Sequence, residues 1–269
     1  MSVVQNGVKH EAQQWGSDHG LEIDQYGIEA IRIIKGPASL LYGSDAIAGV
    51  VAIQPAKIPE RNSFNGSVNL LTETNTDLYA VSAGMQSRGQ NWFYRGRLTY
   101  RDYADFKVPT DQINYENYIF NLHNHDLRNT AGKEADASLS LGYISSNFRT
   151  ETFFSTVSAK NGFFANAHGL EVRNSSIAYD ASNRDIDLPF HQVNHIKIIN
   201  NSTLNLDAHR LHVDLGYQHN QREEHSEPVP HGYMPKPPDS RERVFTKNTY
   251  SLNVKDVVNW GAHTVSAGI

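Results

Sequence analysis

Histidine and carboxylate side chains are the groups in this chain best suited to metal chemistry. The 269 residues include 13 histidines and no cysteine, so a transition-metal site would use imidazole and carboxylate ligands rather than thiolates. Asp18 and His19 are adjacent in a polar N-terminal loop, and His123 and His125 lie in a long polar segment. These ligand types suit zinc and similar metals. The four residues are therefore the candidate metal ligands, although for any one histidine a solvated loop position is the simpler interpretation.

Catalytic motifs are not found. His10-Glu11 begins like the zinc-protease pattern His-Glu-x-x-His, but residue 14 is Gln, so the second histidine is missing. The sequence also lacks a nucleophile elbow, a phosphate-binding loop, a dinucleotide glycine motif and an EF-hand loop. We therefore expect no enzyme activity and no cofactor.

Composition narrows the class of protein further. The formal net charge is −5 and no basic cluster follows the chain, so nucleic acid is not an expected partner. Mean hydropathy is −0.53, and no run of about 18 apolar residues predicts a membrane helix. A transmembrane barrel fits this composition, because only alternate residues of its strands face lipid.

Period-two alternation from Asn62 onward predicts the elements that would position these side chains. In the segment 92–101, Trp92 and Tyr100 stand at the two ends of an apolar face. Three arginines, Arg95, Arg97 and Arg101, occupy the opposite face. Such a strand fits a lipid-facing band with aromatic residues at both interfaces and charges inside. Further strands are expected near residues 62–70, 79–85, 137–143, 150–159, 194–206, 210–221, 246–258 and from 263 onward.

The connections between these strands alternate in length. After two early turns near Asn75 and Gly89, long links at 103–134, 160–193 and 222–244 alternate with short links at 145–148, 207–209 and 259–262. Short turns at one end and long loops at the other are typical of outer-membrane barrels. A soluble β-sandwich shares the period-two pattern, but three structureless loops of about 20 to 35 residues would be unusual there.

The N-terminal part contains a different unit. Residues 28–34 form an expected strand with one drier face, Lys35-Gly36-Pro37 stops it and starts a short helix through Leu41, and a second strand covers residues 50–53. This segment, IEAIRIIKGPASLLYGSDAIAGVVAI, resembles the C-terminal end of the plug domain of TonB-dependent outer-membrane receptors. The resemblance covers about 26 residues, with the Lys-Gly-Pro, Leu-Tyr-Gly and Gly-Val-Val features.

This resemblance implies a mainly β fold. Residues 1–57 would be the C-terminal part of an α+β plug, and residues 58–269 would be roughly the first nine strands of an antiparallel transmembrane β-barrel. Receptors of this family are longer than this chain, so we expect a fragment. No secretory signal is visible at the start, and the chain stops in what looks like the middle of a strand.

The family implies active uptake of a metal chelate across the outer membrane of a Gram-negative bacterium. Its partners would be the TonB energy-transducing complex, the chelate and outer-membrane lipid. A ferric siderophore or haem is the first expectation, with zinc as the alternative because Asp18-His19 is similar to an Asp-His in the plug loop of zinc-importing members. Similar loops occur in relatives that take iron chelates. We expect ligand contacts from Trp15, Asp18 and His19.

Two further expectations concern the barrel. Arg95, Arg97 and Arg101 would contact the plug through acids such as Glu22, Asp24, Glu29 and Asp45. A hypothesis of a different class is a β-rich binding module without transport.

Overall fold

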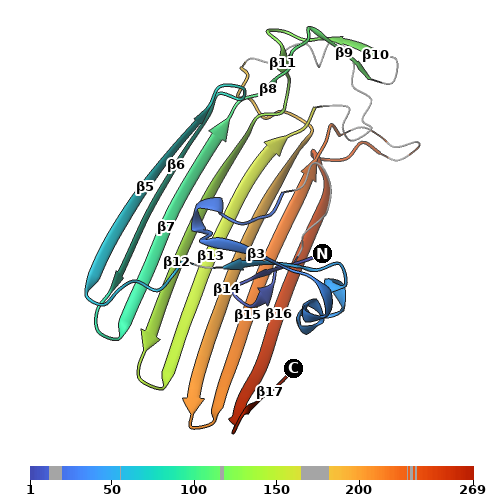
Figure 1. The fold of residues 1–269 in the computed structure, drawn as a ribbon. Helices are drawn as coiled ribbons and strands as arrows, with labels where there is room; N and C mark the ends of the chain where they lie inside the picture. Colours follow the sequence, from blue (N-terminus) through green and yellow to red (C-terminus); the bar gives the residue numbers. More distant parts are fainter. Residues whose placement is uncertain are drawn as a thin grey trace.

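The computed structural model of the chain describes residues 1–11, 20–54, 56–115, 118–164, 182–228, 230, 233 and 235–269. Within these ranges the strands form a four-stranded sheet, a nine-stranded sheet and two small two-stranded sheets. Figure 1 shows the nine strands as one tall, tilted wall with the N-terminal segment in front of it. We call residues 1–54 the N-terminal unit.

The N-terminal unit is built on a mixed sheet of order β2-β1-β4-β3. Strands β1 and β4 pair in parallel, and the other pairs are antiparallel. Val4, Ala46 and Val50 form its core, with Ile34 and Ala52 packed against them. The elements are β1 (Ser2–Gln5), β2 (Val8–Lys9), β3 (Ala30–Ile34), β4 (Val50–Gln54) and the 3-10 helices η1 (Gln25–Gly27), η2 (Gly36–Tyr42) and η3 (Ser44–Ala46).

The two strands expected at residues 28–34 and 50–53 are present as β3 and β4, with the short helix η2 after the Gly-Pro stop. The drier face expected for β3 is not buried. Ile31 and Ile33 are 60% and 58% exposed, because none of the described segments packs over this face of β3, which is an edge strand of its sheet.

The large sheet runs in the order β17-β16-β15-β14-β13-β12-β7-β6-β5, with every neighbouring pair antiparallel. This agrees with the nine strands expected from the alternation pattern. The strands are β5 (Ser63–Glu73), β6 (Leu78–Arg88), β7 (Trp92–Tyr103), β12 (Gly132–Ile144), β13 (Phe148–Gly162), β14 (Phe190–Leu206), β15 (His209–His225), β16 (Arg241–Trp260) and β17 (His263–Gly268).

The two faces of the large sheet differ as the alternation predicts. We call the face that contacts the N-terminal unit the inner face and the opposite one the outer face. On β7, the outer side chain of Leu98 is 68% exposed, whereas the inner side chain of Phe93 is 0% exposed. Trp92 packs edge-on against Tyr143 at one end of the outer face, with 5.0 Å between ring centroids. The outer face is thus an apolar surface with aromatic residues at its margin.

Long and short connections alternate as expected from β7 onward, but the first long connection is not structureless. It contains β8 (Phe106–Lys107), β9 (Gln112–Tyr115), β10 (Tyr118–Asn121) and β11 (Asp126–Leu127), which pair as β9 with β10 and β8 with β11. Both pairs extend beyond the upper end of the wall in Figure 1. The polar composition of this segment predicts a loop, whereas the structure contains two short antiparallel strand pairs. Among the described segments, no helix is both long and apolar enough to cross a membrane.

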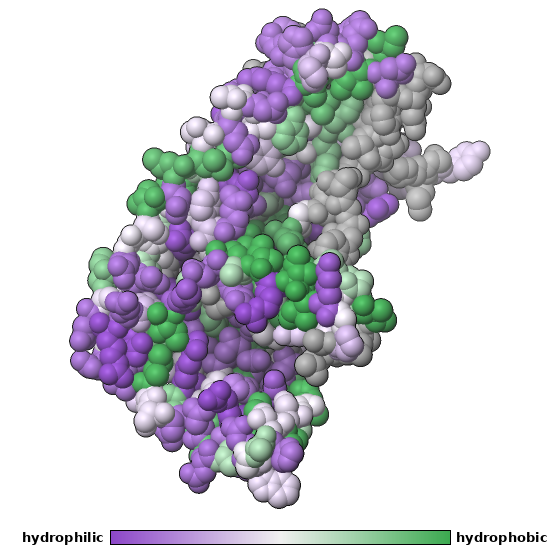
Figure 2. All heavy atoms as spheres, viewed as in Figure 1, coloured by the Kyte–Doolittle hydropathy of each residue, from purple (hydrophilic) through white to green (hydrophobic). Residues whose placement is uncertain are grey.

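The N-terminal unit lies against the middle of the inner face (Figure 1). In the same view, Figure 2 shows a group of hydrophobic side chains at the N-terminal unit, with further hydrophobic groups along the left edge and at the upper end among hydrophilic side chains. The contact between this unit and the polar inner face includes the buried charged residues Glu22, Lys197 and Arg222.

Candidate functional site

The tight turn between β1 and β2 is held by amide side chains of the inner face. Asn6 and Gly7 have φ angles of 50° and 78°, a conformation that Asn and Gly adopt most readily. Asn201 Nδ2 donates to the Asn6 carbonyl at 2.9 Å, and Asn253 Nδ2 donates to the Gly7 carbonyl at 3.2 Å. These bonds satisfy backbone acceptors that would otherwise be left without partners at the contact.

Close packing also holds β2 against the inner face of the large sheet. Val8 is 1% exposed and lies over Gly216 of β15, where an added Cβ would stand 2.8 Å from Val8 Cγ1. Beside it, Gln218 accepts from the Glu11 backbone N–H at 3.2 Å and donates to the Lys9 carbonyl at 2.8 Å. Glycine at position 216 therefore allows the β2 backbone to approach the inner face closely enough for these bonds.

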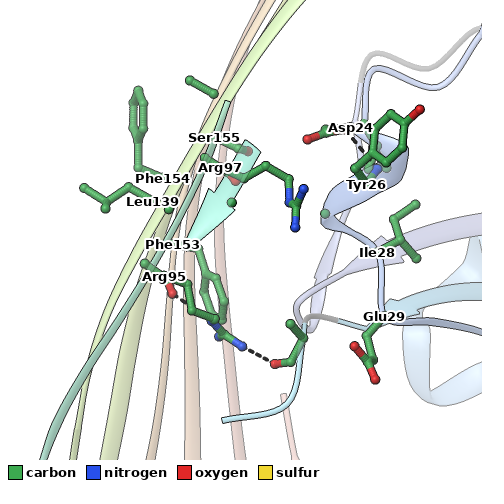
Figure 3. Close-up of a pocket in the computed structure, with 18 of the residues that line it drawn as sticks. Asp24, Tyr26, Ile28, Glu29, Arg95, Arg97, Leu139, Phe153, Phe154 and Ser155 are labelled. Carbon is green, nitrogen blue, oxygen red and sulfur yellow. Dashed lines mark hydrogen bonds between the residues drawn. The ribbon is translucent and has the colours of Figure 1, made fainter. Parts of the chain in front are cut away.

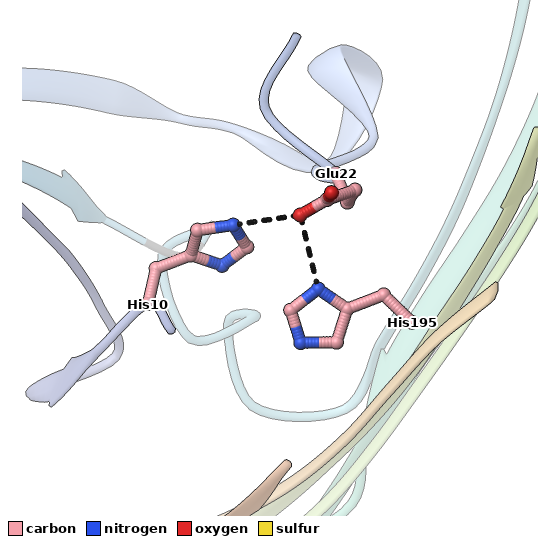
Figure 4. A group of neighbouring side chains, drawn as sticks. All are labelled: His10, Glu22 and His195. Atoms are coloured by element: carbon pink, nitrogen blue, oxygen red, sulfur yellow. Dashed lines mark hydrogen bonds and ion pairs between the residues drawn. The ribbon is translucent and has the colours of Figure 1, made fainter. Parts of the chain in front are cut away.

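A buried polar cluster joins the two parts of the chain. Glu22 and His10 come from the N-terminal unit, His195 and Lys197 from β14, and Arg222 from β15. Glu22 Oε2 lies 3.3 Å from both His10 Nε2 and His195 Nδ1, and Glu22 Oε1 lies 3.4 Å from Arg222 Nη2. Figure 4 shows the two imidazole rings directed at one carboxylate oxygen.

Lys197 of β14 completes the cluster. Its ammonium donates to Gln5 Oε1 at 2.6 Å and to the Glu22 backbone carbonyl at 3.2 Å, and lies 3.3 Å from His10 Nδ1. All these contacts join β14 to the N-terminal unit. Lys197 and His195 are 3% and 0% exposed, so the contacts form in a region shielded from water.

The surroundings of His10 and Glu22, the two cluster residues of the N-terminal unit, set their charge states. Burial lowers the pKa of His10 to about 4, although the nearby Glu22 carboxylate opposes this effect. Burial also disfavours ionisation of Glu22, but the hydrogen bonds from His10 and His195 outweigh it and hold the carboxyl pKa below its usual range. At neutral pH the cluster thus pairs a neutral His10 ring with an ionised Glu22.

A cavity of about 350 Å³ lies beside the cluster, between the N-terminal unit and the inner face. Arg95 and Arg97 point into it from β7, towards Asp24 and Glu29, whereas Leu139 points away from it on the outer side of the wall (Figure 3). The cavity is lined by both polar and apolar groups, and Arg95, Arg97 and Lys197 are among its charged residues.

Comparison with known proteins gives the fold its context. Residues 1–50 match the family model described as the TonB-dependent receptor plug domain. The chain carries a TonB-dependent receptor plug. The siderophore receptor PirA from Acinetobacter baumannii has a similar fold, with a TM-score of 0.69 at 16% identity over 99% of this chain and 39% of that chain.

Two other solved structures show similar folds. A variant of the ferric enterobactin receptor PfeA from Pseudomonas aeruginosa aligns with a TM-score of 0.70 at 14% identity, over 99% of this chain and 40% of that chain. The copper transporter OprC aligns with a TM-score of 0.54 at 12% identity, over 99% of this chain and 46% of that chain. This chain thus spans about 40% of the length of the first two receptors.

These matches confirm the expected family and fold: a plug followed by an antiparallel sheet of the receptor barrel. The N-terminal unit contains the matched plug residues, and the large sheet is the barrel wall. TonB-dependent receptors are transporters rather than enzymes, as the absence of catalytic motifs predicts.

The predicted ligand-binding residues of the plug, Trp15, Asp18 and His19, lie outside the described residues. His123 and His125 are described and exposed, in the connection between β7 and β12. His125 Nδ1 lies 3.2 Å from Asp111 Oδ1. The structure thus places one histidine of this pair beside a carboxylate at the end of the wall that carries the long connections.

The three arginines of β7 face the plug side, but their ionic partners differ from those expected. Arg95 pairs with Glu151 of the wall and also donates to the Ala56 carbonyl just after β4. Arg97 donates to two wall serines, and Arg101 lies 3.5 Å from Glu134. The ion pairs shown for these arginines are thus with wall residues, since the carboxylates of Glu134 on β12 and Glu151 on β13 lie within their reach.

The plug acids named as partners make other contacts. Glu22 binds the cluster of His10, His195 and Arg222, and Asp24 accepts a hydrogen bond from Thr99 at 2.9 Å. Sequence reasoning named Glu22 among the plug acids at the contact, and the structure pairs it with Arg222 of β15. The same reasoning missed Lys197, Gln218 and Arg222 as plug contacts. Their alternate spacing on the inner faces of β14 and β15 was the available signal.

Proposed function

We propose that this chain is part of an outer-membrane transporter that takes up a metal chelate, with a ferric siderophore or haem as first choice. Residues 1–57 would belong to the plug and residues 58–269 to the barrel. Energy for transport would come from the TonB complex, which acts on the plug. The protein would reside in the outer membrane of a Gram-negative bacterium.

One observation carries this proposal: the plug unit packs on the polar face of a sheet whose other face is apolar and exposed. Leu98, Leu139 and Leu252 are between 56% and 68% exposed on the outer face, an arrangement that is unfavourable in water and favourable in lipid. Gln218 and Glu151 are buried on the inner face. A wall that is apolar outside and polar inside, with a plug against its inner face, suits regulated passage of a polar solute.

The outer ends of the strands would provide the ligand contacts. The long connections lie at one end of the wall, with His123 and His125 among their exposed residues. We assign the first ligand contacts to these connections together with Trp15, Asp18 and His19. Arg95, Arg97 and Arg101 would line the route between plug and wall, because the first two border the cavity there.

Uptake measurements test the proposal. Cells that express the full-length receptor, in a strain without other iron receptors, should accumulate a labelled ferric siderophore or haem, and deletion of TonB should abolish this uptake. A full-length protein that fractionates with soluble proteins, or that binds a ligand without uptake, would favour the β-rich binding module instead.

Zinc uptake is the second candidate, favoured by the pairs Asp18-His19 and His123/His125. The variants His19→Ala and Asp18→Ala separate the candidates when both labelled zinc and labelled iron chelates are supplied. Loss of zinc uptake alone would assign the receptor to zinc. If both variants leave affinity and uptake of every ligand unchanged, the proposed role of this loop is wrong. His209→Ala is a matched control, because His209 is exposed at the start of β15, after a short turn at the opposite end of the wall.

A further inference from the structure

We propose that His10, Glu22 and His195 form a binding site for a divalent transition-metal ion of the zinc class, which joins the plug to the barrel wall. Two of the three ligands come from the plug and the third from β14. The site is separate from the loop histidines considered above. The proposal does not rest on the proposed transport function, because metal binding is measured on the purified protein.

The geometry of the three donor atoms fits such an ion. Zinc binds imidazole nitrogen and carboxylate oxygen at about 2.0 to 2.2 Å in tetrahedral sites, which places neighbouring ligand atoms about 3.3 to 3.5 Å apart. Glu22 Oε2 lies 3.3 Å from His10 Nε2 and 3.3 Å from His195 Nδ1. All three donor atoms lie within 4.8 Å of one another. Two of the three distances between donor atoms thus already have the length expected in a tetrahedral zinc site.

The donor set and its surroundings also fit. Two imidazoles and one carboxylate are the protein ligands of several zinc sites that keep a fourth position open. Arg222 contacts Oε1 of Glu22, which leaves Oε2 directed at the two rings. His10 and His195 are 3% and 0% exposed, so their positions are fixed by packing before any ion binds. A preorganised site of this kind loses little side-chain entropy on binding.

The flanking cations weaken binding of any divalent ion, whereas the donor set determines which ion is preferred. Lys197 lies 3.3 Å from His10 Nδ1, where metal-binding histidines more often meet a carboxylate or carbonyl. Its positive charge, with that of Arg222, opposes a divalent ion. Because two of the three donors are imidazole nitrogens, the site favours metals that bind imidazole strongly, such as zinc, copper and nickel, over magnesium and calcium, which prefer oxygen ligands.

Such an ion would bridge two segments that are 173 residues apart in sequence. Its ligands come from both sides of the plug contact, so plug displacement would have to break at least one metal bond. Bound metal would consequently resist separation of plug and wall. This role differs from that of a transported ion, because the site lies among buried residues.

The experiment uses the purified full-length receptor in detergent and zinc ion alone as the probe. Equilibrium dialysis with metal analysis should show one tightly bound zinc fewer per receptor in His195→Gln and His10→Gln than in wild type. The loss of affinity at this site should exceed the roughly 10- to 100-fold typical of outer-shell changes. His209→Gln, which removes an exposed histidine, should keep the wild-type count. An unchanged count in both cluster variants would overturn the proposal.

Two further measurements keep the test decisive if the cluster variants fold poorly. Wild-type receptor loaded with Co²⁺ should give the intense visible absorption of a tetrahedral nitrogen and oxygen site, and its absence would overturn the assignment. Lys197→Met removes an opposing charge but no ligand, so zinc should bind at least as tightly as in wild type. A loss of zinc equal to that of His195→Gln would show a general response to disruption and would contradict the proposal.

Discussion

Removing the Glu22 carboxylate is the perturbation whose effect follows most directly from the structure. Glu22→Ala would leave Arg222 and Lys197, which are both 3% exposed, without the anion at the centre of their cluster. The two imidazoles would also lose their shared acceptor. Because water reaches these groups poorly in the docked state, the variant should weaken the hold of the wall on the plug.

The expected magnitude can be worked from the 3.4 Å contact between Glu22 Oε1 and Arg222 Nη2. At an effective dielectric constant of about 20, unit charges at this separation attract by roughly 5 kcal/mol. Breaking a buried ion pair by removing one partner typically costs about 3 to 5 kcal/mol. The plug should therefore be destabilised by about 3 to 5 kcal/mol, or two to four orders of magnitude in its unfolding equilibrium.

Urea unfolding of the plug in the detergent-solubilised full-length receptor measures this loss. The described chain contains no cysteine, so a fluorophore on a Gln25→Cys variant would report on the plug, with unfolding free energies taken by linear extrapolation. Glu29→Ala is the matched control, because Glu29 is an exposed acid of the same unit and should change stability by less than about 0.5 kcal/mol.

A second substitution sharpens the test. Adding Arg222→Met to Glu22→Ala removes one of the cations that faced Glu22 and should restore part of the lost stability, as a double-mutant cycle would show. The reasoning is refuted if Glu22→Ala unfolds like Glu29→Ala, or if the two cluster substitutions are simply additive.

Two other substitutions probe the packing of the plug and the two faces of the wall. Gly216→Ala would place a Cβ 2.8 Å from Val8 Cγ1, well inside an ordinary contact of about 3.5 to 4.0 Å, and should destabilise the plug by about 1 to 3 kcal/mol in the same urea titration. Gly66→Ala, where the nearest atom would be 3.8 Å away, should have little effect, and equal losses would contradict the close approach. Leu139→Arg should destabilise the barrel by about 2 to 4 kcal/mol if it lies near the bilayer midplane, measured by folding into lipid vesicles. Its neighbour Ser138 lines the cavity, so Ser138→Arg should destabilise the barrel less than Leu139→Arg. A larger loss of stability for Ser138→Arg would show that the two faces are assigned wrongly.

The wall was predictable from sequence because period-two alternation directly encodes which face a residue takes. On β7, Tyr94 and Leu98 alternate with Arg95 and Arg97. This alternation alone indicates which side chains lie on the apolar face and which on the polar face, without knowledge of the adjacent strands. Link lengths then order the strands, since a short link forces neighbouring antiparallel strands to pair. The unit around Gly36-Pro37 was found through family resemblance.

The buried cluster was not predictable in the same way. His10 and His195 have no local pattern that links them, and their contact depends on the register of β14 and on where the plug rests. The failed zinc-protease match at His10 concerned a helical spacing, whereas the structure brings its ring to a residue of a distant strand. The ionic partner of Arg101 was not predictable for a related reason: alternation identifies the face on which Arg101 lies, but not that Glu134 lies opposite it on β12.

The measurement that tests the central claim most directly is the accessibility of spin labels along β16 in the full-length receptor reconstituted into lipid vesicles. Labels at Tyr250, Leu252 and Val254 should collide with lipid-soluble oxygen. Labels at Ser251 and Asn253 should be protected from oxygen, because Asn253 donates to the plug backbone at Gly7. This account predicts an oxygen-collision profile with a period of two residues. A profile without that period, or one in which Leu252 is shielded from lipid and Asn253 is exposed to it, would contradict a wall with lipid outside and the plug inside.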